Sequence, residues 1–144
     1  MKEVRVLVAE DNEDHRFLTI RALREVKGVK IDVDGVGNGE EVMAYITQQG
    51  EYAGKPLPHV IFLDLRMPKM NGLEVLERLK GDPELSCIPV VVLTSSDRAE
   101  DIDAAYKLGT NSYVTKPGAS EEIRSGLRDV ANYWTVGSAL PRCG

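Results

Sequence analysis

Acidic, hydroxyl and basic side chains stand at the ends of four short apolar runs in this sequence. They are Glu10 and Asp11, Asp64, Thr94, and Lys116. Clustered carboxylates repel one another and raise one another's pKa values unless a cation lies among them. Oxygen ligands suit Mg²⁺, and a lysine and a hydroxyl can donate hydrogen bonds to phosphoryl oxygens. If these side chains converge, they supply the groups needed to pass a phosphoryl group to an aspartate, with Asp64 as the nucleophile.

Each of these residues has a simpler explanation when it is considered alone. Acids before a helix favour its positive end, a threonine after a strand commonly caps the next helix, and a single lysine is usually solvated. Asp64 by itself could equally well cap the turn that follows it. The prediction of a site therefore depends on the elements that bring the five residues together.

The apolar pattern predicts five strands, each followed by a helix. The expected strands span residues 4–9, 31–36, 60–63, 89–93 and 112–115. The run at 60–63 is apolar throughout, which is typical of a strand buried on both faces of a parallel sheet. The alternation predicts an α/β fold with a five-stranded parallel sheet and helices on both of its faces. The carboxyl ends of such strands share one edge, and ligands bind at that edge in open α/β sheets.

Apolar residues at helical spacing predict which faces the helices bury. They are Phe17, Ile20, Leu23 and Val26 in the first helix, Val42 and Ile46 in a second at 40–48, Leu73, Leu76 and Leu79 in the third, Ile102, Ala105 and Leu108 in the fourth, and Ile123, Leu127, Val130 and Trp134 in the last. Asn71 is expected to cap the third helix, with Glu74 three residues on, and Ser120 to cap the last. Gly28 and Gly109 are expected to end the first and fourth helices.

The composition favours one soluble globular domain. The chain has 144 residues, 42% of them hydrophobic, and a net charge of −5, which argues against nucleic-acid binding. We expect one domain over residues 1–134, a short tail at 135–144, and neither a signal peptide nor a membrane span. Cys87 and Cys143 lack the spacing of a zinc site or a redox pair, so we expect a chain that needs no disulfide and lies in a reducing cytoplasm, with Cys87 as a small hydrophobic loop residue.

The sequence resembles the receiver domain of two-component response regulators, of which CheY is the single-domain type. The matching motifs are Glu10-Asp11 after the first strand, Asp64 in LDLRMPKMNG, Thr94 in VVLTSS, and Lys116-Pro117 after the fifth strand. The resemblance extends from residue 4 to about residue 133. It implies the flavodoxin-like strand order 2-1-3-4-5, the order found in CheY.

The resemblance also implies how the acidic residues act. Asp64 would accept a phosphoryl group from a phosphohistidine of a sensor histidine kinase. Mg²⁺ would be held by Asp11, by Asp64, by the backbone carbonyl of Arg66 and, through water, by Glu10. Lys116 would pair with the phosphorylated Asp64.

The resemblance implies a route from the site to a signalling face. Thr94 would move toward the phosphoryl oxygen, and Tyr113 would rotate inward to fill the space left behind. The fourth helix, fifth strand and fifth helix would present the resulting change to a partner protein. The Lys116–Pro117 peptide bond is expected to be cis, as in the family.

Three features are similar to the small regulators that partner bacterial phytochromes. These are the loop at residues 49–58, the GDPELSCIP segment and the Tyr133-Trp134 ending. They imply a bacteriophytochrome as the kinase. Tyr133, Trp134 and the tail could form a homodimer contact or simply pack down as the end of the last helix, and we favour the contact. His15 and His59 have no partner at metal-ligand spacing, so we expect surface or loop roles for them.

Other functions stay open. A phosphorelay intermediate or phosphate sink would use the same chemistry without an output of its own. A phosphohydrolase of the haloacid dehalogenase type would need a second aspartate two residues after the nucleophile, where Arg66 stands. A flavodoxin-like FMN carrier would need a hydroxyl-rich phosphate loop after the first strand, where this chain has two acids. A pseudo-receiver that never takes phosphate is disfavoured because every residue of the set is present.

Overall fold

Five parallel strands form one sheet in the order β2-β1-β3-β4-β5. The computed structural model describes residues 2–116, 120–141 and 143, with backbone only for 120–124. The strands are β1 (Lys2–Ala9), β2 (Val29–Val36), β3 (Val60–Leu63), β4 (Val90–Thr94) and β5 (Ser112–Thr115). The predicted α/β class and strand order are confirmed.

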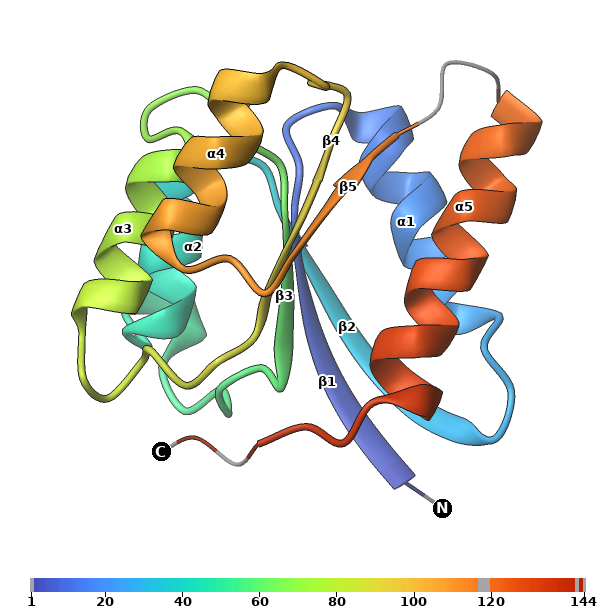
Figure 1. Ribbon diagram of the computed structural model, residues 1–144. Helices are drawn as coiled ribbons and strands as arrows, with labels where there is room; N and C mark the ends of the chain where they lie inside the picture. The colour runs from blue at the N-terminus through green and yellow to red at the C-terminus, as the bar shows by residue number, and fades with distance from the viewer. Residues whose placement is uncertain (1, 117–119, 142, 144) are drawn as a thin grey trace.

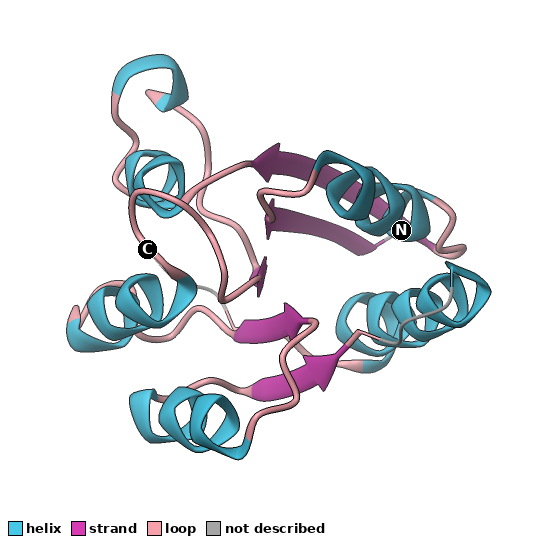
Figure 2. Ribbon diagram, turned by 90° about the horizontal axis from the view of Figure 1, so that it is seen from above, coloured by secondary structure: helices cyan, strands magenta, loops and turns pink. Residues whose placement is uncertain are grey.

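Helices cover both faces of the sheet. They are α1 (Glu13–Arg24), α2 (Gly39–Ile46), α3 (Gly72–Gly81), α4 (Ala99–Leu108) and α5 (Ser120–Asn132), with a short 3₁₀ turn η1 (Gly50–Tyr52) and a π-helical turn η2 (Tyr133–Gly137) after α5. In Figure 1, α1 and α5 lie on one side of the sheet and α2, α3 and α4 on the other. Figure 2, seen from above, shows the strands as the middle of three layers. No helix in the described part of the chain is both long and apolar enough to cross a membrane.

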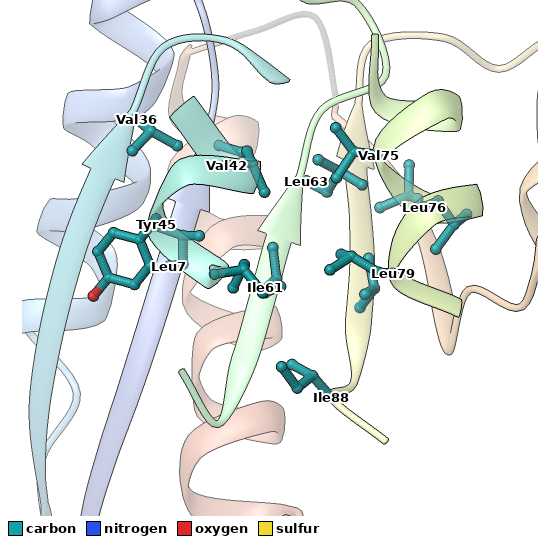
Figure 3. Packing of buried hydrophobic residues seen from close by; sticks show 14 of the residues in the cluster. Leu7, Val36, Val42, Tyr45, Ile61, Leu63, Val75, Leu76, Leu79 and Ile88 are labelled. Atoms are coloured by element: carbon teal, nitrogen blue, oxygen red, sulfur yellow. The ribbon is translucent and has the colours of Figure 1, made fainter. Parts of the chain in front are cut away.

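The position of β3 in the middle of the sheet explains why its sequence is apolar throughout. Ile61 and Leu63 belong to the hydrophobic cluster under α2 and α3, whereas Val60 and Phe62 belong to the cluster under α1 and α5. Successive side chains of a strand point to opposite faces, so a central strand covered by helices on both sides needs an apolar residue at every position. All four are fully buried, each stabilising the fold by about 1.5–3 kcal/mol. Figure 3 shows Ile61 and Leu63 beside the residues of α2 and α3.

Three asparagines begin the helices that follow β1, β2 and β3. The side chains of Asn12, Asn38 and Asn71 each accept a hydrogen bond from the backbone N–H three residues on. Such caps stabilise a helix by about 1 kcal/mol each. The cap predicted at Asn71 is confirmed, and so is the end of α4 at Gly109, whose φ of 104° is left-handed. Helix α5 begins at Ser120, but the cap predicted there lies outside the described side chains.

The predicted buried face of α1 is wrong at its first residue. Phe17 is 63% exposed, and the helix buries Thr19 and Ala22 beside the predicted Leu23. Residues three apart drift around a helix of 3.6 residues per turn, so a strict spacing of three carries its first member away from the sheet. In α3 the buried set likewise includes Val75 beside Leu76 and Leu79.

The cysteines also differ from the expectation. Cys87 and Cys143 form a disulfide, with their Cα atoms 6.2 Å apart, within the usual range for such a bond. The segment after α5 crosses beneath the sheet toward α3 (Figure 1), which brings Cys143 to the loop that precedes β4. Spacing along the sequence could not show this pair, because its partners are 56 residues apart.

Candidate functional site

The acidic residues meet because β1 and β3 are neighbours in register. Ala9 pairs with Leu63, and the N–H of Asp64 donates to the carbonyl of Ala9 at 2.9 Å. The residues that leave the ends of these strands therefore face each other. Glu10, Asp11 and Asp64 each offer a carboxylate oxygen within 4.8 Å of the others. The predicted convergence at the carboxyl edge of the sheet is present.

Lys116 reaches this cluster from β5, two strands away from β3. The backbone N–H of Lys116 donates to the carbonyl of Thr94 at 2.7 Å, which places the residue at the same edge. Its side chain is buried, with the ammonium group in contact with the carboxylate of Glu10 and 3.5 Å from Oδ2 of Asp64. A buried ammonium group requires such partners, since desolvation of an unpaired charge is costly. The Lys116–Pro117 bond, predicted to be cis, lies outside the described residues.

The two buried carboxyl groups differ in pKa. Burial, together with the hydrogen bond and negative charge of Asp64, raises the pKa of Glu10 to about 8 against the opposing effect of Lys116. Burial also disfavours the ionised form of Asp64, but hydrogen bonds from Glu10 and Thr94, the charge of Lys116 and the N–H of Arg66 lower its pKa overall. The proton of the pair therefore lies on Glu10, which leaves Asp64 as a free carboxylate at neutral pH.

The donor set fits a hard divalent cation. Glu10 and Asp64 are buried while Asp11 is exposed, so the carboxylates line a site that is open to water on one side. Three acids with one lysine leave an excess of negative charge, which a divalent cation would neutralise. The backbone N–H of Arg66 lies 3.3 Å from Oδ1 of Asp64, so the peptide that follows the acid runs directly beside it.

Thr94 and Tyr113 are connected through one residue of the β4–α4 loop. Thr94 is fully buried, and its hydroxyl oxygen lies 3.5 Å from the backbone N–H of Ser96. The carbonyl of Ser96 accepts a hydrogen bond from the Tyr113 hydroxyl at 2.8 Å, and the Ser96 hydroxyl donates to Asp101 at 2.5 Å. Ser96 therefore links the strand end near Asp64 to β5 and to the first turn of α4.

His15 belongs to the site, which the sequence analysis did not predict. Its Nδ1 lies 3.2 Å from the Lys116 ammonium and 3.5 Å from a carboxylate oxygen of Glu10. The cap at Asn12 turns α1 back over the strand end, so a residue in its first turn faces the acids. The place of His15 in the first turn after the acidic pair was the sequence signal that could have predicted this contact. His59, in contrast, accepts a hydrogen bond from the backbone N–H of Arg5 at 2.8 Å, in keeping with the predicted loop role.

An open groove of about 750 Å³ adjoins the acidic cluster. Its lining includes Asp11 and Arg66, together with Arg98 just before α4 and Asp101 in the first turn of α4. Arg98 is 61% exposed and pairs with Glu100 at 2.8 Å. Its two arginines, Arg66 and Arg98, can donate hydrogen bonds to an anionic group that enters the groove.

The chain matches a known family over most of its length. Residues 6–128 fit the response regulator receiver domain. Response regulator Rcp1 of Synechocystis sp. is 34% identical over 139 residues, which cover 96% of this chain and 93% of Rcp1.

Solved structures agree with the family match. The Mn²⁺-bound form of Rcp1 gives a TM-score of 0.92 over 96% of this chain and 99% of that one. The phosphorylated cyanobacterial phytochrome response regulator RcpA is 37% identical, with a TM-score of 0.92 over 97% and 99% of the two chains. The bacteriophytochrome response regulator RtBRR is 35% identical, with a TM-score of 0.73 over 98% and 85%. The chain belongs to the response regulator receiver domain family.

Proposed function

We propose that this chain is a phosphorylation-activated switch of a two-component system, which accepts a phosphoryl group on Asp64 from a sensor histidine kinase. The observation that carries the proposal is the environment of Asp64. Its carboxylate is ionised although buried, with Glu10 and Asp11 within 4.8 Å and the Lys116 ammonium 3.5 Å away. A free carboxylate nucleophile beside a fixed cation suits phosphoryl transfer better than it suits a purely structural role.

The neighbouring residues have distinct tasks in this transfer. An oxygen of Asp64 attacks phosphorus, and the bond from phosphorus to the donor nitrogen breaks. Lys116 balances the charge that gathers on the phosphoryl oxygens, and the Thr94 hydroxyl donates a hydrogen bond to one of them. Asp11, Asp64, the backbone carbonyl of Arg66 and, through water, Glu10 would hold Mg²⁺, which neutralises phosphoryl charge when bound.

The contacts of Ser96 would transmit the phosphorylation state of Asp64 to the signalling face. When Thr94 turns toward the phosphoryl group, its contact with the Ser96 N–H is lost and the β4–α4 loop moves. Ser96 also holds the hydroxyl of Tyr113, so the tyrosine is released to rotate inward. The face formed by α4, β5 and α5 then differs between the two states, which a partner protein can detect.

Relatives support the choice of partner. RcpA is described as a phytochrome response regulator and RtBRR as a bacteriophytochrome response regulator. We infer a bacteriophytochrome-type histidine kinase as the donor, action in the cytoplasm, and a homodimer as the signalling form. Tyr133, on the turn that follows α5, is 61% exposed and is available for such a contact.

Intact mass after incubation with acetyl phosphate tests the proposal. The wild-type chain should gain one phosphoryl group with Mg²⁺ and none with EDTA, and Asp64→Asn should gain none in either. Asp103→Asn is the matched control, because Asp103 is an exposed acid on α4, away from the acidic cluster. It should be phosphorylated like the wild type. A folded wild-type chain that gains no mass, or an adduct that survives in Asp64→Asn, would overturn the assignment.

Size-exclusion chromatography of the same samples tests the output. A shift to dimer only in the phosphorylated wild type would support regulated dimerisation. An adduct without any change in size or in partner binding would favour the role of a phosphorelay intermediate or phosphate sink.

A further inference from the structure

The segment that follows α5 is held to the rest of the chain by few contacts. Thr135 is fully buried and donates to the carbonyl of Ala131, but most of the later residues are exposed. Beyond it, the Lys2 ammonium donates to the carbonyl of Ser138 at 2.8 Å, and Leu140 packs against the cluster under α1 and α5. The described residues after η2 run past the amino-terminal ends of the strands, toward the side of the sheet that carries α2 and α3 (Figure 1).

The disulfide joins the two helical layers. Leu140 contacts the cluster on the α1 and α5 side, whereas Cys143 packs against the cluster on the α2 and α3 side and bonds to Cys87. The covalent bond is thus the contact that fixes the far end of the segment. Without it, the described residues from 138 onward would be held by the Lys2 contact, by a hydrogen bond of 2.7 Å from the Ser138 N–H to the Tyr133 carbonyl, and by the half-buried Leu140.

The loop that carries Cys87 does not depend on the disulfide in the same way. The Lys80 ammonium donates to the carbonyls of Ser86 and Ile88, at 3.0 and 2.8 Å, on either side of the cysteine. Ile88 itself is fully buried. Cleavage of the bond would therefore release the tail and leave the loop in place.

We propose that Cys87 and Cys143 form a reversible thiol-modification site, a redox latch that fastens the tail, here meaning residues 138–141 and Cys143, at the amino-terminal edge of the sheet. Cys87 is exposed and Cys143 half-buried, so small thiols and disulfides can reach the bond. Exposed disulfides are the labile and regulatory ones, and those found in cytosolic proteins are usually redox-sensing.

The chemistry of the latch is thiol–disulfide exchange. The thiolate of one cysteine attacks a low-molecular-weight disulfide and releases one small thiol. The second cysteine then attacks the mixed disulfide, forms the protein disulfide and releases the second small thiol. The protein loses two electrons and two protons, which the two small thiols carry away, and the reverse sequence opens the latch.

The latch is separate from the acidic site. Cys87 precedes β4 and lies at the amino-terminal edge of the sheet, whereas Asp64 and Lys116 follow strands at the opposite edge. Redox state should therefore alter the tail without altering phosphoryl acceptance. The proposal stands whether or not Asp64 accepts a phosphoryl group.

The test begins with the full chain equilibrated in glutathione buffers of graded redox ratio and then alkylated. The chain has only two cysteines, so the oxidised form should take no alkyl group and the reduced form two, with reversible conversion. Hydrogen exchange of both forms then measures the tail. The amides of residues 138–140 should lose protection by about tenfold on reduction, while those of β3 stay unchanged.

Substitutions separate the latch from other effects of the reductant. Cys143→Ser should show the unprotected tail in both buffers, and Ser86→Ala, beside Cys87, should behave like the wild type. The midpoint of thermal unfolding should fall by about 5–15 °C when the wild type is reduced, and should not change in Cys143→Ser.

Three results would overturn the proposal. They are two alkylated thiols in every buffer, a disulfide that no glutathione ratio reduces, and tail exchange that is the same in both redox states.

Discussion

The two edges of the sheet differ in the residues that cover the strand ends. At the carboxyl edge, Glu10, Asp64 and Lys116 bury charge beside an open groove. At the amino-terminal edge, the tail is held by a hydrogen bond from the exposed Lys2, by the packing of Leu140 and by the Cys87–Cys143 bond. The carboxyl edge carries an excess of negative charge that a bound cation can neutralise. The amino-terminal edge is covered by the chain's own tail.

The direction of the strands explains this difference. In a parallel sheet every strand ends at the same edge, and the asparagine caps start α1, α2 and α3 there, so the positive ends of these helices point toward the acids. The opposite edge receives the helix carboxyl ends and the loops that return to the strands. Anionic ligands therefore belong at the first edge, and the second is available for structural closure.

Of the substitutions considered, loss of the Lys116 ammonium should destabilise the fold most. Lys116→Met leaves Glu10 and Asp64 without their buried cation, and loss of one partner of a buried ion pair should lower the free energy of unfolding by about 3 kcal/mol. Urea denaturation at pH 7 measures this loss, and Mg²⁺ should recover part of it. Lys55→Met is the control, because Lys55 pairs with Asp34 at a half-exposed site. Its loss should destabilise the fold far less, because solvent screens that pair, and equal losses in the two variants would contradict the comparison.

The two ends of α3 provide the second comparison. A Cβ at Gly72 would lie 2.2 Å from the backbone oxygen of Asp64, whereas a Cβ at Gly81 would meet nothing within 4 Å. Gly72→Ala should therefore lower the free energy of unfolding by about 1–3 kcal/mol and slow phosphorylation, because the backbone of Asp64 must shift. Gly81→Ala should raise the free energy of unfolding by about 0.5 kcal/mol. Chemical denaturation measures both, and a neutral Gly72→Ala would disprove the close approach.

The pH dependence of Mg²⁺ binding should show whether Glu10 carries a proton at neutral pH. The pKa of Glu10 is raised to about 8, so below that pH a cation must displace a proton. The apparent affinity for Mg²⁺ should therefore rise with pH, by up to about tenfold per unit, and level off above pH 8. Titration calorimetry at several pH values measures this. Affinity that stays constant between pH 6 and pH 8 would show that Glu10 is already ionised.

The smallest effect is expected away from both edges, at Asp34. Burial opposes its ionisation, but a 2.6 Å hydrogen bond from Tyr45 and the pairing with Lys55 lower its pKa overall. Because this folded-state pKa lies below the unfolded value of 3.8, the stabilisation is present above pH 3.8 and is lost as the pH falls through the lowered pKa. Tyr45→Phe should cost about 0.5–1 kcal/mol at pH 7 and nothing in strong acid, as measured by urea denaturation. A cost that does not change with pH would assign the loss to packing.

The sequence by itself determined the elements and the members of the acidic site. The apolar runs, the asparagine cap at Asn71 and the glycine stop at Gly109 are local signals, since each depends on residues within one turn or one strand. Because parallel strands all end at one edge, the residues that follow the apolar runs had to converge, and Glu10, Asp11, Asp64 and Lys116 do so.

Tertiary structure alone decided which side chains touch across elements. The contact of His15 with Lys116, the central position of Ser96 between Thr94 and Tyr113, and the Cys87–Cys143 bond each join segments that are far apart in sequence. The exposure of Phe17 depended on the rotation of α1 against the sheet. Such contacts follow from how helices pack and where the tail returns, and no residue pattern along the chain encodes those distances.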